Sequence, residues 1–326
     1  MDYRMTTHCY PISEYDTFAR QHVLRGNRLI PTDHYHTGIV VKAGGNCLAA
    51  AVLYVNPHMA IPGRRPGIIG VYGATENTAA VSRLFETAEA LAGEAGLDFL
   101  IGPMDGSTWE DYRFHDHPER PLFLMEMQHP SYYPNQWKSA GFQPVAHYFS
   151  TTAPLFERPD TRMEQVKSRL LHDGITFRGI DHANYGAELR KLHPFLLEAF
   201  KQNRFYTPIG LSSFVAKYRP MKDLMKSGFI QIAEYGGEIA GVLFCVANPL
   251  DPTGGSLVVK TLARRPGRMF RGLGQVMVEA LYQKALAAGY RQLIFAFMIA
   301  DGDARPLSDR YNGRTLKTYT LYGKAI

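Results

Sequence analysis

The feature that most constrains the fold of this chain is an internal repeat. Residues 43–57 align without a gap on residues 235–249, and each copy carries a Gly-Gly pair near its start and an Asn-Pro pair at its end. A strand-like run precedes each Gly-Gly pair and an apolar run follows it, which is typical of a β-hairpin. Each hairpin is followed by a helical period that ends in glycine, a β-rich run and an Asp-Gly pair. The sequence therefore predicts a mixed α/β (α+β) fold in which one unit occurs twice.

The repeat divides the chain into two predicted domains. At 326 residues the chain has the length of two ordinary domains. We expect one domain over residues 1–155 and a second over residues 175–326, with a linker over residues 156–174. Within the linker, residues 161–171 have the period of an amphipathic helix, and Asp160 is placed to cap its start.

Composition excludes several classes of protein. The apolar fraction of 45% is ample for two cores, no apolar run approaches the ~20 residues of a membrane span, and the first residues lack the apolar segment of a secretory signal. Three widely spaced cysteines indicate a reducing compartment. Two histidine clusters, His34-Tyr35-His36 and His115-Asp116-His117, each lack a third ligand at a usable spacing. We therefore expect a cytoplasmic protein without a metal, a membrane or a nucleic-acid partner, for which a homodimer is open.

A cluster of arginines and glycines lies between a predicted strand over residues 257–263 and a predicted helix over residues 275–288. The net charge of the chain is +6, and four positive charges fall within eight residues: Arg264, Arg265, Arg268 and Arg271. Gly272 and Gly274 let the backbone approach a ligand closely, and the free N–H groups and the dipole of a helix start favour an anion. The sequence therefore predicts a site for a phosphorylated small molecule.

The order of elements in residues 175–326 resembles the GNAT superfamily of acyl-CoA N-acyltransferases. In that family a Gln/Arg-x-x-Gly-x-Gly/Ala loop holds the pyrophosphate of coenzyme A. Gly272 and Gly274 match its glycines, whereas Met269 stands at its first position, flanked by Arg268 and Arg271. The resemblance implies two tandem GNAT-like domains, each with a central, mostly antiparallel sheet flanked by helices.

The same resemblance implies that acetyl-CoA or another acyl-CoA is the co-substrate. The residues expected to bind it are Leu262, Ala263, Arg264, Arg268, Met269, Phe270, Arg271, Gly272, Leu273 and Gly274. Backbone N–H groups near Leu262 and Ala263 are expected to contact the pantetheine arm.

The first domain resembles a degenerate copy of the same fold. Its loop over residues 73–79 has one early glycine, no arginine and an acidic Glu76, which opposes a pyrophosphate. Trp137 stands where the family has the tyrosine that protonates the leaving thiolate, and an indole has no proton to give at a usable pKa. We expect this domain to serve packing, dimer contact or the shape of the acceptor cleft.

Acyl transfer to an amine needs a neutral amine and an acid for the leaving thiolate. Candidates for the acid are Tyr311, which is favoured, and Tyr319 and Tyr322 in the closing strand. Candidates for the base are Asp301, Asp303, Glu198 and Glu234, with ordered water as a further possibility.

Two loops are candidates for binding the acceptor, residues 102–113 and residues 201–206. The first is explained equally well as an ordered turn in which Trp109 plugs the edge of a core, and the second as a surface helix end. Our hypothesis is transfer of an acyl group, expected to be acetyl, from acyl-CoA to a primary amine of a small molecule or protein, by direct attack in a ternary complex. The alternatives are a catalytically silent acyl-CoA-binding sensor or scaffold, and an aminoacyl-tRNA-dependent transferase, which needs a broad basic face.

Overall fold

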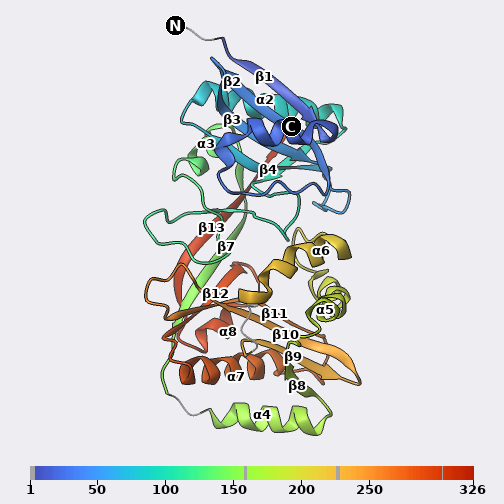
Figure 1. Cartoon of the computed structure of the whole chain (residues 1–326), viewed down its shortest axis with the longest axis vertical. Coiled ribbons are helices and arrows are strands. Elements are labelled where there is room, and N and C mark those ends of the chain that lie inside the picture. The colour runs from blue at the N-terminus through green and yellow to red at the C-terminus, as the bar shows by residue number, and fades with distance from the viewer. Residues whose placement is uncertain (1–3, 158–159, 225–227, 303) are drawn as a thin grey trace.

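The computed structural model describes residues 4–157, 160–224, 228–302 and 304–326 (Figure 1). The strands are β1 (Thr6–Pro11), β2 (Tyr35–Ala43), β3 (Asn46–Tyr54), β4 (Pro66–Ala74), β5 (Phe99–Gly102), β6 (Phe114–His115), β7 (Gln143–Pro154), β8 (Thr176–Gly179), β9 (Ile230–Tyr235), β10 (Glu238–Ala247), β11 (Ser256–Arg264), β12 (Gln292–Ile299) and β13 (Arg314–Ala325). The α-helices are α1 (Tyr15–Gln21), α2 (Thr78–Glu94), α3 (Tyr133–Ser139), α4 (Thr161–His172), α5 (Tyr185–Phe200), α6 (Leu211–Tyr218), α7 (Leu273–Ala287) and α8 (Arg305–Asp309). The predicted mixed α/β fold class is confirmed.

The two predicted hairpins are β2–β3 and β9–β10. Both Gly-Gly pairs have left-handed backbone, with φ of 56° and 83° at Gly44 and Gly45, and 59° and 81° at Gly236 and Gly237. A two-residue hairpin turn with positive φ at both positions favours glycine because a side chain is strained there. The repeat seen in the sequence is therefore a repeat of turn geometry.

The thirteen strands of the described chain form one continuous sheet, in which the two halves exchange their last strands. The order along the sheet is β1-β2-β3-β4-β5-β13-β7-β12-β11-β10-β9-β8, with β6 beside β13. Thus β7, from the first half, pairs with β12, and β13, from the second half, pairs with β5. In Figure 1 β7 and β13 run side by side through the middle of the molecule. This exchange, which the sequence pattern did not predict, ties the halves together.

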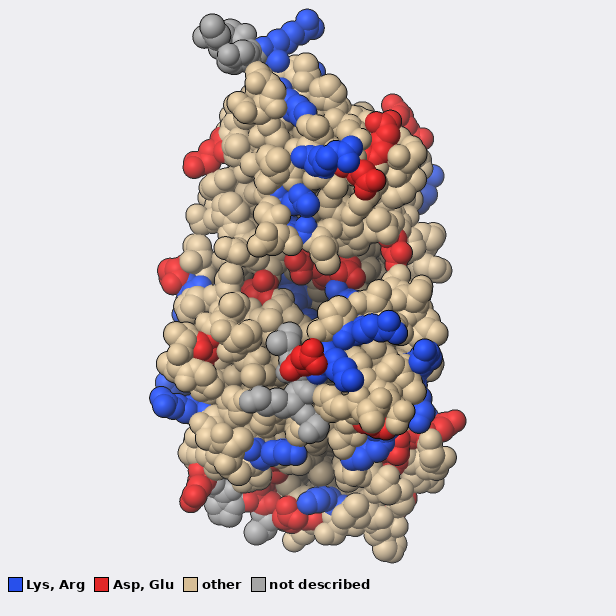
Figure 2. Space-filling model, in the orientation of Figure 1, with Lys and Arg blue, Asp and Glu red and all other residues tan. Residues whose placement is uncertain are grey.

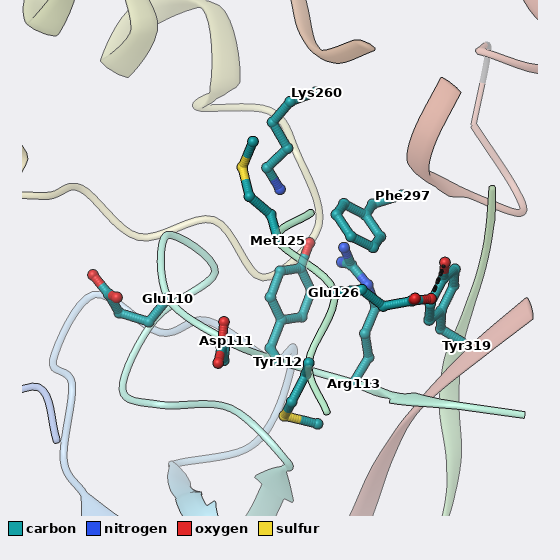
Figure 3. Close-up of a pocket in the computed structure, with 10 residues that line it drawn as sticks. Glu110, Asp111, Tyr112, Arg113, Met125, Glu126, Lys260, Phe297 and Tyr319 are labelled. Atoms are coloured by element: carbon teal, nitrogen blue, oxygen red, sulfur yellow. Dashed lines mark hydrogen bonds between the residues drawn. The ribbon is translucent and has the colours of Figure 1, made fainter. Parts of the chain in front are cut away.

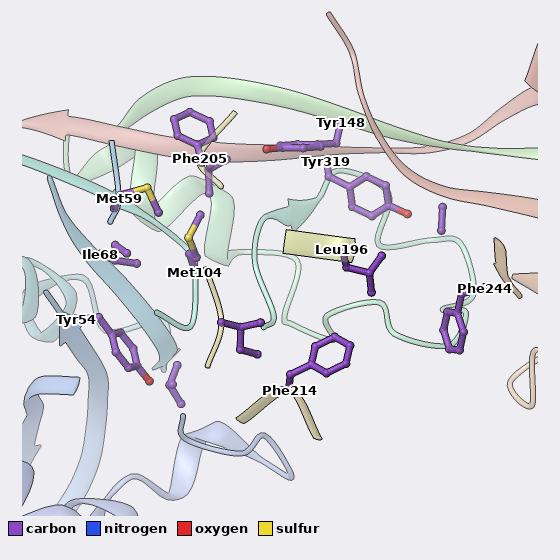
Figure 4. Packing of buried hydrophobic residues seen from close by; sticks show 14 of the residues in the cluster. Tyr54, Met59, Ile68, Met104, Tyr148, Leu196, Phe205, Phe214, Phe244 and Tyr319 are labelled. Atoms are coloured by element: carbon purple, nitrogen blue, oxygen red, sulfur yellow. The ribbon is translucent and has the colours of Figure 1, made fainter. Parts of the chain in front are cut away.

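Three groups of buried side chains hold the layers together. One lies between α2 and the sheet of the first half, and a second between α7 and the sheet of the second half. The face of α7 that packs on the sheet is formed by Leu273, Met277, Leu281 and Ala285, which are all fully buried. The third group joins the halves and includes Tyr54, Met104, Leu196, Phe214 and Tyr319 (Figure 4).

Each half contains two parallel strands that pair at their start and then part. In the second half β11 and β12 pair from Ser256–Gln292 to Val259–Phe295, after which β11 follows β10 and β12 follows β7. We call this opening the β11–β12 gap. In the first half β4 and β5 pair up to Ile68 and leave a corresponding β4–β5 gap.

A bulge marks both gaps. On β11 the pairing with β10 skips Lys260, and on β4 the pairing with β3 shifts around Val71, which has a φ of 49°. Bulges re-aim side chains and are frequent beside active sites. The bulge therefore makes Lys260 and its surroundings a candidate for the functional site.

Candidate active site

A pocket lies beside the β11–β12 gap and is built by both halves. Its lining residues are Glu110, Asp111, Tyr112, Arg113, Met125, Glu126, Met127, Lys260, Phe297 and Tyr319 (Figure 3). The second half supplies Lys260 from the bulge of β11 and Phe297 from β12. The segment between β5 and α3, in the first half, supplies seven of the ten. Part of the predicted acceptor loop over residues 102–113 thus lines a pocket, while Trp109 donates its indole N–H to the carbonyl of Thr207 at 2.8 Å and ties the halves together.

Lys260 is the unusual charged group of this pocket. Its Nζ lies 4.4 Å from the ring centre of Phe297, and no carboxylate of the described residues forms an ion pair with it. Burial, followed by the nearby cations Arg113 and Lys217, lowers the pKa of Lys260 to about 7, and Asp111 opposes this shift. A large fraction of Lys260 is therefore neutral near pH 7 and can accept a proton.

Two carboxylates of the pocket are already engaged. Glu126 lies 2.8 Å from Nζ of Lys317 in a buried ion pair, and the Tyr319 hydroxyl donates to its Oε1 at 2.8 Å. Glu110 lies 2.6 Å from Nζ of Lys217. Burial raises the pKa of Tyr319, so that its hydroxyl keeps its proton at neutral pH.

Of the predicted catalytic residues, the structure brings only Tyr319 to the pocket. Tyr311 is buried in the core beneath α7, where its ring stacks on Tyr282 and its hydroxyl donates to Glu279 at 3.1 Å. Asp301 is exposed and lies 3.5 Å from the Arg204 guanidinium, outside the pocket lining.

The other candidates are placed as follows. Tyr322 is buried against Trp137 and Phe114 in the first half, Glu198 pairs with Lys201, Glu234 pairs with Arg178, and Asp303 lies outside the described residues. Sequence spacing does not report on which face of the sheet a side chain lies. It therefore predicted these residues although their side chains do not line the pocket. Lys260 was missed, although a single lysine in an apolar strand was the available signal.

The four arginines of the predicted phosphate loop differ in whether their side chains already have an ion pair or a hydrogen bond within the chain. Arg265 pairs with Glu238 at 2.6 Å, and Arg264 donates to the backbone carbonyl of Arg265 at 2.9 Å. Arg268 and Arg271 are exposed and form no ion pair with a described residue. The side chains of two further predicted residues, Phe270 and Leu273, are buried in the core, so only their backbone can reach a ligand.

The start of α7 meets the requirements of a phosphate site. Gly272 precedes the helix with a φ of 87°, and no side chain caps this end. The Leu273 amide donates to Phe270, but the amides of Gly274 and Gln275 have no acceptor in the described part of the chain. A Cβ at Gly274 would lie 3.3 Å from the Leu262 side chain, so glycine lets α7 lie close on β11. These features fit a phosphate group of a ligand.

The corresponding places in the first half are filled by the chain itself. The side chain of Asn77 caps α2 by accepting from the Ala80 amide at 2.9 Å. Trp137 is fully buried, and a Cβ on Gly102 would come within 2.6 Å of its ring. The Trp137 side chain therefore serves packing.

The described residues contain no group of three or more His, Cys, Asp or Glu side chains placed to hold a metal. Among the described helices, none has both the length and the apolar character that crossing a bilayer requires.

Comparison with known proteins supports the fold. No family model matches the chain. A bacterial ceramide synthase of Caulobacter vibrioides is 24% identical over 300 residues, which cover 81% of this chain and 76% of that protein.

Several solved structures share the fold over nearly the whole chain. A tandem GNAT protein from the clavulanic acid biosynthesis pathway matches with a TM-score of 0.54 at 10% identity, covering 99% of this chain and 98% of that one. A GCN5-related N-acetyltransferase from Sphaerobacter thermophilus gives 0.53 at 13% identity, covering 98% and 95%. A GCN5-related glucosamine N-acetyltransferase region of a fungal multi-domain β-N-acetylglucosaminidase gives 0.57 at 13% identity, and this chain, covered to 99%, spans 38% of that protein. The chain therefore has the tandem GNAT fold that its sequence pattern resembles.

Proposed function

We propose that this chain is an N-acyltransferase that moves an acyl group from acyl-CoA to a primary amine. The observation that carries the proposal is the continuity of β11. The middle of this strand places Lys260 in the pocket beside the β11–β12 gap, and its C-terminal end leads through the arginine loop to the start of α7, which no side chain of the described residues caps. A ligand that reaches from the amides of Gly274 and Gln275 along β11 arrives at Lys260.

The binding residues divide by type of contact. Arg268 and Arg271 would neutralise the phosphates, and the amides at the start of α7 would donate hydrogen bonds to them. Beyond Val259 the edge of β11 that faces β12 has no strand partner in the described structure, so the backbone near Leu262 is available for the pantetheine arm.

The pocket supplies the groups for direct attack. The amine nitrogen forms a bond to the thioester carbonyl carbon, and the carbon–sulfur bond breaks. Neutral Lys260 takes the proton that the amine loses, and the Tyr319 hydroxyl gives a proton to the leaving sulfur. Each proton transfer of this type contributes typically about 10²–10⁴-fold in rate.

The relative named a ceramide synthase bears on the choice of substrates. Ceramide is the N-acyl derivative of a long-chain amino alcohol, so its synthesis forms the bond proposed here. The acceptor panel should therefore include a long-chain amino alcohol, and the acyl donors should run from acetyl-CoA to a long-chain acyl-CoA.

Calorimetric titration with acetyl-CoA and a long-chain acyl-CoA tests the binding step. We expect binding by the native chain and about ten- to a hundredfold weaker binding by the double variant Arg268→Glu/Arg271→Glu, because charged hydrogen bonds contribute about 1.5–3 kcal/mol. The matched control, Arg64→Glu/Arg65→Glu, reverses two exposed charges in the first half and should bind as the native chain does. Absence of binding by the native chain contradicts the proposal.

Release of free thiol across the amine panel tests the chemistry. Thiol release that depends on a primary amine supports an N-acyltransferase, whereas acyl-CoA binding without release favours the silent sensor. Transfer from a charged tRNA would favour the third candidate. Figure 2 shows acidic and basic side chains interspersed on the visible face rather than a broad basic surface.

A further inference from the structure

The most unusual group of the molecule outside the proposed proton transfers is Arg113. Its side chain is almost fully buried, with 4% of the residue exposed, yet it forms no ion pair with a described residue. Its Nε and Nη1 have no hydrogen-bond partner among the residues that the structure describes. Four rings surround the guanidinium carbon, with centres at 3.9 Å (Tyr112), 4.3 Å (Phe297), 4.6 Å (Tyr148) and 5.6 Å (Tyr319).

Aromatic rings do not replace a counter-ion. An arginine stays charged in a protein, and a buried charge is costly unless it is both paired and hydrogen-bonded. Contact with ring faces offsets part of this cost and leaves the N–H groups without acceptors. The Arg113 guanidinium would therefore be stabilised by a negatively charged ligand that accepts hydrogen bonds from it.

The carboxylates of the pocket do not meet this need. Glu126 is paired with Lys317, and Glu110 is paired with Lys217. Asp111, with 47% of its side chain exposed, has its ion pair with a different arginine. In Figure 3 the Arg113 and Lys260 side chains both reach the space beside Phe297, and neither has a carboxylate partner there.

The backbone around this space is held in an unusual conformation. Arg113, Met125 and Phe297 have φ of 65°, 68° and 60°, which is uncommon for residues with side chains. Arg113 and Met125 come from the segment between β5 and α3, Phe297 comes from β12, and all three line the pocket. Such residues persist only where the surrounding structure holds them, and they concentrate at binding sites. The Arg113 fork is thus presented in a preformed orientation.

We propose that the pocket binds an oxyanion, a carboxylate or a phosphate, carried by the amine acceptor, with Arg113 as its binding residue. This inference rests on the proposed function for the identity of the ligand as acceptor. The planar fork of a guanidinium donates two parallel hydrogen bonds to either oxyanion, and Nε and the Nη groups are the donors that such a pair uses. The acceptor is accordingly an amine that also carries a carboxylate or a phosphate, and its neutral nitrogen is directed toward Lys260.

The experiment uses small probes of matched shape. Acetate, its neutral isostere acetamide and inorganic phosphate are titrated into the full chain at constant ionic strength, with calorimetry and the thermal midpoint as readouts. We expect acetate, phosphate or both to bind and raise the midpoint, while acetamide does neither. The Arg113→Met variant should bind the oxyanion about ten- to a hundredfold more weakly, the loss expected for charged hydrogen bonds. The Arg190→Met variant removes an exposed arginine of α5, outside the pocket lining, and should bind as the native chain does.

The thermal midpoint of Arg113→Met in the absence of ligand separates a binding role from a purely structural one. For a binding role the midpoint should be unchanged or higher, because methionine fills a similar volume without a buried charge. A purely structural role predicts a lower midpoint. A lower midpoint together with unaltered oxyanion binding would overturn the proposal, as would equal binding of acetate and acetamide by the native chain.

The comparison of acetate with phosphate separates the two sources of the oxyanion. A response to acetate alone indicates an amino acid-like acceptor, and a response to phosphate alone indicates a phosphorylated amine. Acyl-CoA titration of the same samples keeps the two proposals apart. Intact acyl-CoA binding without an Arg113-dependent oxyanion response defeats this inference alone. The reverse result defeats the proposed function, and with it the identity of the ligand as an acceptor, while the oxyanion site at Arg113 stands.

Discussion

The two halves of the molecule open the same gap in the sheet, and only one of them leaves it accessible. In the first half the chain fills the β4–β5 gap with its own groups: the Met104 amide donates to Ile69 at 2.9 Å, and the Asp105 carboxylate accepts from the Val71 amide at 2.6 Å. In the second half the β11–β12 gap is lined by Lys260 and Phe297, beside a pocket. A bulge occurs at both gaps, so the bulge alone does not decide whether a gap is filled. The side chains beside each gap decide it.

The helix that starts after each gap shows the same contrast. At α2 Asn77 supplies an acceptor to the first turn, and Glu76 precedes it. At α7 Gly272 supplies none, and Arg268 and Arg271 stand before it. At this helix start the first half supplies its own acceptor, while the second half leaves donors and positive charge for a ligand.

This contrast gives the first half a role other than catalysis. Because β7 and β13 are exchanged, the segment that follows β5 lies against the second half and supplies Arg113 and Glu126 to its pocket. We infer that the first half completes the active site of the second.

Replacing the charged residue at the second bulge should have the largest effect. Lys260→Met keeps most of the side chain's length and removes the proton acceptor, so kcat/KM for acyl transfer should fall by about 10²–10⁴-fold. Steady-state kinetics with the best amine of the panel measures it. Acyl-CoA affinity, measured by calorimetry, should stay within about twofold because Lys260 is not among the residues proposed to hold the phosphates. A variant that keeps most of its activity would show that Lys260 is not the base.

The two Asp-Gly pairs of the repeat test whether the first gap is a structural core. Asp105 is 3% exposed and pairs with Arg28 at 2.8 Å, whereas Asp301 is exposed. Asp105→Ala removes the acceptor of the Val71 amide and leaves the largely buried Arg28 with only the more distant Asp111 carboxylate, at 3.9 Å, so the free energy of unfolding should fall by about 3–5 kcal/mol. Asp301→Ala, the matched control, should change it by less than about 0.5 kcal/mol. Urea denaturation of both variants decides, and equal losses would remove the distinction between the gaps.

The pH dependence of transfer should report on the Lys260 pocket. Burial, Arg113 and Lys217 lower the pKa of Lys260 to about 7, with Asp111 acting against them. Only the neutral form accepts a proton, so the rate should rise about tenfold per pH unit below pH 7 and level off above it. Rate profiles of the native chain and of Lys260→Met, measured on one acceptor, separate this limb from the titration of the acceptor itself. The same limb in both profiles would exclude Lys260 as its source.

Much of this architecture was predictable because its signals are local. The Gly-Gly pairs require left-handed backbone, the apolar face of α7 follows from its period, and the arginine loop stands between a strand and a helix. These features need only a short window of sequence. The tandem fold followed from their order.

The pocket was not predictable because it depends on distant pairing. Nothing near β13 indicates that it joins β5, so Tyr319 could not be placed beside Glu126, nor Arg113 beside Phe297. Tyr311 was favoured from its spacing to a glycine, and the structure instead packs its ring under α7. The sequence shows which side chains can take part in proton transfer or binding, but it does not predict which side chains of the two halves contact one another.

The smallest expected effect concerns the start of α2, and it tests whether the first half has kept any capacity for a phosphorylated ligand. Asn77→Ala removes the acceptor for the Ala80 amide and should lower the free energy of unfolding by about 1 kcal/mol, the usual cost of losing such a cap. It also frees a donor that the helix dipole presents to anions. Because Glu76 repels a phosphate and no arginine stands in this loop, we expect the acyl-CoA affinity and the number of bound molecules, measured by calorimetry, to stay unchanged. A second binding event in Asn77→Ala would show that a single cap, rather than the whole gap, separates the two halves in function.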